Sequence, residues 1–391
     1  MLALAPVLAA ISAGNCVMVK PSELAVTSQN LLAKLVPQYL DQSAIRLVTG
    51  GPAETGRILE RKFNHIFFTG SSTIARHITA AAAKHLTPTV LELGGQGPAI
   101  VTGSANIDLS AKRLALSKVL NAGQICLSAN HVFVDPAIHD KFVERLGFWM
   151  AKQIEDESHM VHIINERHYE RITSLLEKSQ GKIAYGGKLD KTSKYISPTV
   201  ITDVTTSDSL LSGEIFGPVL PVIKATYVEA YKIISSMDHP LGIYIFSEKQ
   251  TEIDEILDNT NSGGVTINDT ILHSAVPNAP FGGVGESGYG MSHGQYGFNS
   301  FSHQRIVLQM PTWMEVLFSF RYPPYDLAAN VKKTQVKNTL GFKRGETMAD
   351  QKIRNVGLGW YGLLPLSVVI VVLAKVMDQD PGKRIAGLLK K

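Results

Sequence analysis

One of the chain's two cysteines stands where the backbone is expected to reverse direction. In the run Asn121-Ala-Gly-Gln-Ile-Cys126 the thiol follows a helical stretch and a glycine, so backbone N–H groups can lie close to it. Such amide dipoles lower a thiol pKa and hold a developing oxyanion, and a thiolate adds rapidly to a carbonyl carbon. Taken alone, a cysteine between isoleucine and leucine is more often an inert core residue. Cys126 is therefore a candidate nucleophile that needs support from other residues.

A carboxylate is expected at the end of an apolar strand. Glu92 lies in Val90-Leu-Glu-Leu-Gly-Gly95, where a glutamate is paired, exposed at the rim of a sheet, or functional. Ligand crevices of doubly wound sheets lie beyond the carboxyl ends of the strands, and a partly desolvated carboxyl group there has a raised pKa suited to general base work. We therefore predict that Glu92 is a general base.

A glycine turn at residues 68–75 could face a dinucleotide. It lies between an expected strand and an expected helix, so free N–H groups near Gly70 and Ser71 are placed to meet a pyrophosphate. The turn lacks the full G-x-G-x-x-G pattern, and a turn that only joins a strand to a helix is equally compatible.

A second candidate for cofactor binding is the run Lys20-Pro-Ser-Glu23, at the exit of another expected strand. Lys20 and Glu23 could bind ribose hydroxyls there. The alternative is a solvated first helical turn, in which Ser22 caps the helix and Glu23 favours its dipole.

Strands and helices alternate through the first part of the chain. Apolar runs that end in turn residues predict strands at 17–20, 46–49, 65–69 and 89–93, with helices at 26–39, 55–61 and 73–84. This alternation predicts a parallel sheet with helices on both faces, as in dinucleotide-binding folds. A mixed α/β region follows to about residue 297, and we interpret it as a second domain.

The first residues are apolar but lack the basic start of a signal peptide. Residues 2–14 are therefore predicted to form a core helix, which leads into a buried strand containing Cys16. Two cysteines make a disulfide framework implausible and favour a reducing compartment.

Length and charge limit the possible functions. With 391 residues, 45% of them hydrophobic, the chain is long enough for two packed domains and for an enzyme. Its 38 basic and 34 acidic residues give a net charge of +4 but form no concentrated basic arm. Nucleic acid is therefore not an expected partner.

An apolar run near the C-terminus predicts a membrane anchor. Residues 356–374 contain no charge over nineteen positions, which at a rise of about 1.5 Å per residue span roughly 28 Å, close to the thickness of a bilayer core. Arg354 and Lys375 bracket the run. We expect a single anchor in the membrane of the endoplasmic reticulum, the mitochondrial outer membrane or the membrane of a peroxisome. The catalytic part would lie on the cytosolic side. The alternative is a buried helix.

Six motifs, in this order, resemble those of the aldehyde dehydrogenase superfamily: Val19-Lys-Pro-Ser-Glu23, Phe67-Phe-Thr-Gly-Ser71, Leu91-Glu-Leu-Gly-Gly95, Gly123-Gln-Ile-Cys126, Glu214-Ile-Phe-Gly-Pro218 and Pro280-Phe-Gly-Gly-Val-Gly-Glu-Ser-Gly288. The run at residues 293–303 and the apolar tail resemble the class 3 branch with its tail-anchored fatty aldehyde dehydrogenases. The resemblance covers about residues 1–325.

The resemblance implies an α/β aldehyde dehydrogenase fold. Its expected parts are a partial, Rossmann-like NAD(P)-binding domain (1–91), a catalytic domain (92–298), a bridging and oligomerisation segment (299–325), a basic linker (326–355) and the membrane helix (356–374). Family members carry more than a hundred residues before the point that matches Met1, including an asparagine that donates to the oxyanion. A chain without one such donor is expected to be slower by about a hundred- to a thousandfold.

The resemblance also implies roles for single residues. Cys126 would be the nucleophile and Glu92 the general base, and no metal is expected. Glu214 would contact the nicotinamide ribose of NAD or NADP, with Phe216 packing beside it. The remaining cofactor contacts would be Lys20 and Glu23 at the adenosine ribose, and Gly70 and Ser71 at the nicotinamide or pyrophosphate end.

The implied reaction is the oxidation of an aldehyde to a carboxylic acid through a thioester on Cys126. An anchored enzyme would meet lipophilic substrates, so fatty aldehydes are expected first, with aromatic or apocarotenoid aldehydes as alternatives. A homodimer is the expected assembly. The competing hypotheses are an inactive membrane-tethered scaffold with the same fold, and an esterase or thioesterase that uses Cys126 and Glu92 without a redox step.

Overall fold

The computed structural model describes residues 2–318 and 321–326. It divides at Arg305 and Ile306 into two units. The predicted membrane helix at 356–374, and the predicted linker from residue 327 onwards, lie outside the described residues. Within the described ranges, no helix is long and apolar enough to cross a membrane.

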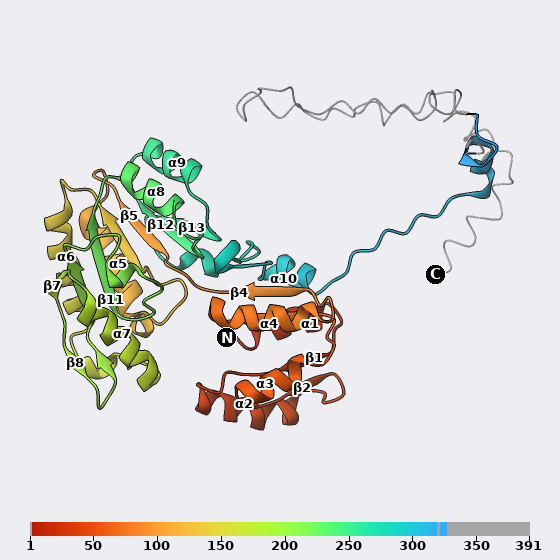
Figure 1. The fold of residues 1–391 in the computed structure, drawn as a ribbon, viewed down its shortest axis with the longest axis horizontal. Helices are drawn as coiled ribbons and strands as arrows, with labels where there is room; N and C mark the ends of the chain where they lie inside the picture. The colour runs from red at the N-terminus through yellow and green to blue at the C-terminus, as the bar shows by residue number, and fades with distance from the viewer. Residues whose placement is uncertain (1, 319–320, 327–391) are drawn as a thin grey trace, which may run out of the picture. The chain divides into compact units, whose positions relative to one another are not determined.

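The first ninety or so residues form the expected alternation of helices and strands (Figure 1). The strands are β1 (Val17–Val19), β2 (Ile45–Leu47), β3 (Ile66–Thr69) and β4 (Thr89–Glu92). The helices are α1 (Ala5–Ser12), α2 (Val26–Tyr39), α3 (Pro52–Leu59) and α4 (Ser72–Ala83). Each predicted strand and helix of this region is present, with ends shifted by a few residues.

The predicted single sheet is divided into two. Strand β1 pairs in parallel with β2, and β3 pairs in parallel with β4, but β2 and β3 belong to different sheets. The second edge of β4 is taken by β14 (Gly288–Tyr289), which runs antiparallel to it. Alternation in the sequence predicts that neighbouring strands run parallel, but it does not determine which edges join.

The predicted N-terminal helix is present, and only part of its apolar surface is buried in the core. Helix α1 buries Val7 and Ala10, whereas Leu8 is 69% exposed. The predicted burial of Cys16 is wrong, since this residue is exposed. Cys16 precedes β1, a short strand with one paired edge, of which Val19 is the buried residue.

A seven-stranded sheet organises the region from residue 98 to residue 267, with the strand order β13-β12-β5-β6-β11-β10-β7. Strand β7 runs antiparallel to β10, and the other pairs are parallel. The strands are β5 (Pro98–Val101), β6 (His131–Val134), β7 (Lys182–Tyr185), β10 (Thr199–Thr202), β11 (Val219–Lys224), β12 (Gly242–Phe246) and β13 (Gly264–Ile267), and a separate pair is formed by β8 (Leu189–Asp190) and β9 (Tyr195–Ile196).

Helices cover both faces of this sheet because its strands are apolar on both sides. Ile100, Phe133 and Ile245 belong to the core that packs against α7 (Glu166–Lys178), α8 (Tyr227–Ser235) and α9 (Gln250–Asn259). Their neighbours along the strands, such as Val101 and Val134, face α5 (Ile107–Val119) and α6 (His139–Gln153). The alternation of the two faces follows the two-residue period of a strand.

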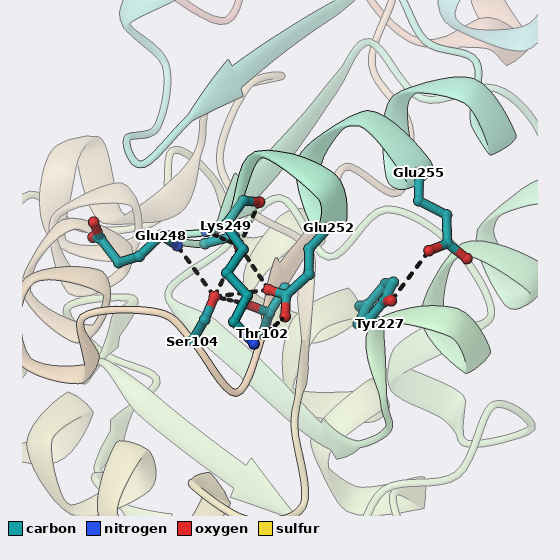
Figure 2. A network of polar contacts seen from close by, with 8 residues as sticks. Thr102, Ser104, Tyr227, Glu248, Lys249, Glu252 and Glu255 are labelled. Carbon is teal, nitrogen blue, oxygen red and sulfur yellow. Dashed lines mark hydrogen bonds and ion pairs between the residues drawn. The ribbon is translucent and has the colours of Figure 1, made fainter.

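A polar network closes the carboxyl ends of β5 and β12 (Figure 2). The Glu252 carboxylate accepts hydrogen bonds from Ser104 and Ser247, each at 2.7 Å, and pairs with Lys249 at 3.4 Å. Burial alone would raise the pKa of Glu252. The hydrogen bonds from Ser104, Ser247, Thr102 and Lys249 together outweigh burial and lower this pKa to about 2. The network fixes the first turn of α9 to the sheet.

The residues predicted to act in chemistry lie near the opposite, amino ends of these strands. Cys126 precedes β6, Glu214 precedes β11, and Glu92 ends β4 shortly before β5. Helix α10 (Gly294–Ser300) packs on α1 in the same unit. In the second unit, η6 (Thr312–Met314) leads into the short helix α11 (Glu315–Phe318).

Candidate active site

One large cavity in the first unit collects nearly all the predicted site residues. Its volume is about 2410 Å³. Its lining contains Glu23, Gly70, Ser71, Glu92, Cys126, Glu214 and Phe216. Lys20 joins the group indirectly, because its Nζ lies 3.0 Å from the Glu23 carboxylate.

The turn that carries the thiol has an unusual backbone. After α5, three consecutive residues, Asn121, Ala122 and Gly123, have positive φ angles of 52°, 52° and 66°. This conformation is costly for residues with a Cβ, so surrounding contacts must impose it. One contact is visible at Gly123, where an added Cβ would lie 2.3 Å from the Gly217 carbonyl oxygen. The turn with Cys126 is therefore packed directly against the turn that follows Glu214.

The environment of Cys126 does not favour the thiolate, contrary to the prediction. Burial raises the pKa of the thiol to about 12, and the carboxylates of Glu214 and Glu92 raise it as well. The backbone N–H groups of Cys126 and Leu127 lower it, as expected from the turn, but their effect is smaller. The sequence indicated the amides and could not indicate how much burial and negative charge would surround the sulfur.

Glu92 has the properties expected of a base. It is buried, and burial raises the pKa of its carboxyl group to about 7, against a hydrogen bond from Ser292 that lowers it. The Ser292 hydroxyl donates to Oε1 at 3.0 Å. Oε2 is buried and has no hydrogen-bond partner among the described residues. One carboxylate oxygen thus accepts a hydrogen bond, and the other is a buried acceptor without a partner in the described part of the chain.

Glu214 lies against the glycine pair that follows Glu92. A Cβ on Gly94 would be 2.4 Å from Glu214 Oε1, so the carboxylate occupies the space that a side chain at residue 94 would need. Burial raises the pKa of Glu214 to about 7, and the Gly95 N–H, Arg171 and Lys118 lower it. Phe216, two residues on, has a positive φ of 46° and also lines the cavity.

Two basic side chains that no sequence motif indicates support the turn at Glu214. The guanidinium of Arg171 donates to the carbonyl oxygens of Glu214 and Ile215, at 3.1 and 2.7 Å. Lys118 is fully buried on α5 and donates to the Gly217 carbonyl at 3.3 Å. Burial lowers the pKa of Lys118 to about 7, while Glu214 raises it. Both look like ordinary charged residues of helices in the sequence, and no local pattern marks them.

The predicted cofactor residues Gly70 and Ser71 lie at one part of the cavity wall. Helix α4 begins there, with Ser71 as its cap and Ser72, Thr73 and Ile74 in the lining, and the N-terminus of a helix is a favourable place for an anion. An added Cβ on Gly70 would lie 2.5 Å from the ring of Phe68. Lys20 is held between Glu23 and the Gly50 carbonyl, at 3.0 and 3.1 Å.

This chain belongs to the aldehyde dehydrogenase family, whose sequence model matches residues 1–307. It is similar to aldehyde dehydrogenase family 3 member A2 of Rattus norvegicus, with 41% identity over 83% of this chain and 67% of the relative. It is also similar to the dimeric, NADP-preferring aldehyde dehydrogenase of the same organism, with 41% identity over 83% of this chain and 72% of that one.

Among solved structures, the substrate-bound state of Staphylococcus aureus AldH resembles it with a TM-score of 0.75 and 33% identity, over 82% of this chain and 74% of that one. The α/β aldehyde dehydrogenase fold predicted from the six motifs is confirmed. The chain is an enzyme of this family, an aldehyde dehydrogenase that uses NAD or NADP.

Proposed function

We propose that this enzyme oxidises lipophilic aldehydes, with fatty aldehydes first, through a thioester on Cys126 that Glu92 helps to hydrolyse. The observation that carries the proposal is the joint presence of Cys126 and Glu92 in one cavity with a largely apolar wall. That wall includes Leu211, Ile233, Met237, Leu241, Ile271 and Val276. Transfer of an alkyl chain from water to this apolar surface has a favourable free energy.

Glu92 is proposed to act twice as a proton acceptor. Because the thiol pKa is near 12, Cys126 needs a base to become a nucleophile, and Glu92, with a pKa of about 7, is ionised above neutral pH. The thiolate adds to the carbonyl carbon, and the N–H groups of Cys126 and Leu127, which already face the sulfur, are placed to meet the oxyanion. NAD(P)+, when bound, supplies the hydride acceptor.

Glu92 then releases to solvent the proton that it took from Cys126, and hydrolysis releases the acid. Glu92 takes a proton from a water molecule, whose oxygen forms a bond to the thioester carbon. The C–S bond breaks and the carboxylic acid leaves. The departing thiolate takes the proton from Glu92, which restores the Cys126 thiol and the Glu92 carboxylate. Oε2 of Glu92, without a protein partner in the described part of the chain, is the proposed acceptor for that water.

The cofactor contacts are proposed from their places around the cavity. Glu214 binds the nicotinamide ribose, and Phe216 packs beside it. Gly70 and Ser71 allow the pyrophosphate to approach the first turn of α4. Lys20 and Glu23 bind the adenosine ribose, for which their ion pair of 3.0 Å would have to rearrange.

Steady-state formation of NADH or NADPH with a series of saturated aldehydes tests the substrate class. We expect kcat/KM to rise with chain length from propanal to dodecanal, since each buried CH2 contributes about 0.8 kcal/mol. A series of substituted benzaldehydes is the comparison. If kcat/KM were flat along the alkyl series and higher for the aromatic aldehydes, the fatty-aldehyde proposal would be wrong and the aromatic alternative favoured.

We also propose a homodimer. One relative is named as dimeric, and residues 306–308 expose three large apolar side chains, Ile306, Val307 and Leu308, at 93%, 78% and 76%. A stretch of this kind is a usual interface element. Light scattering coupled to size exclusion would give twice the chain mass; a single-chain mass at micromolar concentration would contradict the proposal.

The membrane anchor at 356–374 is a further proposal, based on the uncharged run in the sequence. It would place the enzyme at the cytosolic face of the endoplasmic reticulum, the mitochondrial outer membrane or a peroxisome. Such a location would bring the cavity close to aldehydes that partition into lipid.

A further inference from the structure

A serine two hundred residues away in the chain contacts the general base proposed above. Ser292 Oγ lies 3.0 Å from Glu92 Oε1 and 3.2 Å from the Phe281 carbonyl oxygen. A hydroxyl group has one hydrogen and two lone pairs, so Ser292 can donate to only one of these acceptors at a time. Which one receives the hydrogen depends on whether Glu92 carries a proton.

We propose that Ser292 is a positioning residue for Glu92, whose hydroxyl exchanges its acceptor as Glu92 gains and loses a proton. When Glu92 is ionised, Ser292 donates to Oε1 and leaves Oε2 free. When Glu92 is protonated, its O–H donates to Ser292 Oγ, which then donates to the Phe281 carbonyl. No proton is gained or lost by the serine, so the exchange is balanced. The inference rests on the proposed role of Glu92 as base.

The backbone holds Ser292 firmly in this place. Ser292 and Phe281 form an antiparallel bridge, with N···O distances of 2.7 and 3.2 Å. The next residue, His293, stacks its ring on that of Phe281 at 4.9 Å and 14°. His293 also has a positive φ of 73°, a conformation that a residue with a side chain adopts only under constraint from its surroundings.

The backbone of the neighbouring segment is closely packed, while the Ser292 side chain lines the cavity. A Cβ on Gly282 would lie 2.2 Å from the Gly290 carbonyl oxygen, so the strand-like segments at 281–282 and 290–292 are in direct contact. Glu92 is tied to the same region from the other side, since β4 pairs with β14 through Glu92 and Gly288. Backbone pairing on both sides therefore holds the two residues next to each other, at a spacing that permits the 3.0 Å contact between hydroxyl and carboxylate.

A hydrogen bond donated to the carboxylate stabilises its ionised form, so its removal must raise the pKa of Glu92. The test is an infrared titration of the Glu92 carboxyl band, isolated as the difference between wild type and Glu92→Gln. In Ser292→Ala the midpoint should rise by about one pH unit, because a hydrogen bond to a charged group contributes roughly that much. Ser292→Thr, which keeps the hydroxyl, should return towards wild type.

The matched control is Ser300→Ala. Ser300 is also partly buried, and its hydroxyl binds the carbonyl oxygens of Met291 and Tyr296 in the same segment. The midpoint of the Glu92 titration in Ser300→Ala should equal that of wild type. An unshifted midpoint in Ser292→Ala, or an equal shift in Ser300→Ala, would overturn the inference.

Thioester hydrolysis, measured with octanal and NAD+ in the same variants, separates this inference from the proposed function. In Ser292→Ala, the pH at which the hydrolysis rate falls on the acidic side should rise by the same amount as the infrared midpoint. A shifted midpoint with an unshifted rate profile would overturn the positioning role. Wild-type turnover in Glu92→Gln would instead refute the base itself, whatever the infrared titration shows.

Discussion

The Glu214 carboxylate fills the space above Gly94, where an added Cβ would lie 2.4 Å from Oε1. Gly94→Ala should therefore push Glu214 away from its place and weaken cofactor binding by about tenfold or more, because a hydrogen bond to a charged group contributes about 1.5–3 kcal/mol. Fluorescence titration with NAD+ and NADP+ measures the change. Gly213→Ala is the control, since an added Cβ there meets nothing within 4 Å. Equal affinities in the two variants would count against a cofactor role for Glu214.

The pH dependence of thioester hydrolysis follows from Glu92. Burial raises its pKa to about 7, and only the ionised form accepts a proton from water. The hydrolysis rate should therefore fall as the pH drops below about 7, towards tenfold per pH unit well below the pKa. Single-turnover decay of the acyl-enzyme measures it. A rate independent of pH across neutrality would argue for another base.

Cys126→Ser should abolish aldehyde oxidation and leave cofactor binding intact, because a serine hydroxyl near neutral pH supplies almost no anionic nucleophile. Loss of a nucleophile costs several orders of magnitude in kcat. Cys16→Ser is the matched control, since Cys16 is exposed and lies outside the cavity lining. Retained dehydrogenase activity in Cys126→Ser, or its loss in Cys16→Ser, would refute the assignment of the nucleophile.

Removal of residues 356–391 should release the protein from membranes. The uncharged run at 356–374 is long enough to span a bilayer core with little tilt. After alkaline carbonate extraction, the full chain should stay in the membrane pellet, and a chain that ends at Asn355 should appear in the supernatant. Release of both would place the apolar run on the soluble part or at a subunit interface.

Local patterns in the sequence predicted the elements around the site well. Glu92 at a strand end and Cys126 after a turn were found from a few neighbouring residues, and the structure brings both into one cavity. The six ordered motifs gave the fold. Strand pairing was predicted only in part, because β14 joins β4 from almost two hundred residues further along the chain.

The properties that depend on distant residues could not be predicted. The pKa of Cys126 is raised by burial and by Glu214, which no local pattern connects to it. Ser292 contacts Glu92 across two hundred residues of sequence. In the sequence, Lys118 looks like an ordinary basic residue of a helix, but in the folded chain it is almost completely buried. Each of these facts needs the tertiary structure, because burial and long-range contacts have no local signature.

The central claim, a thioester on Cys126 that Glu92 helps to hydrolyse, is tested most directly by trapping the thioester. Glu92→Gln cannot accept the proton of the attacking water, so the acyl-enzyme should accumulate when octanal and NAD+ are supplied. Intact-mass spectrometry should show one added octanoyl group, and peptide mapping should place it on Cys126. Wild-type turnover without an adduct, or an adduct on another residue, would contradict the account.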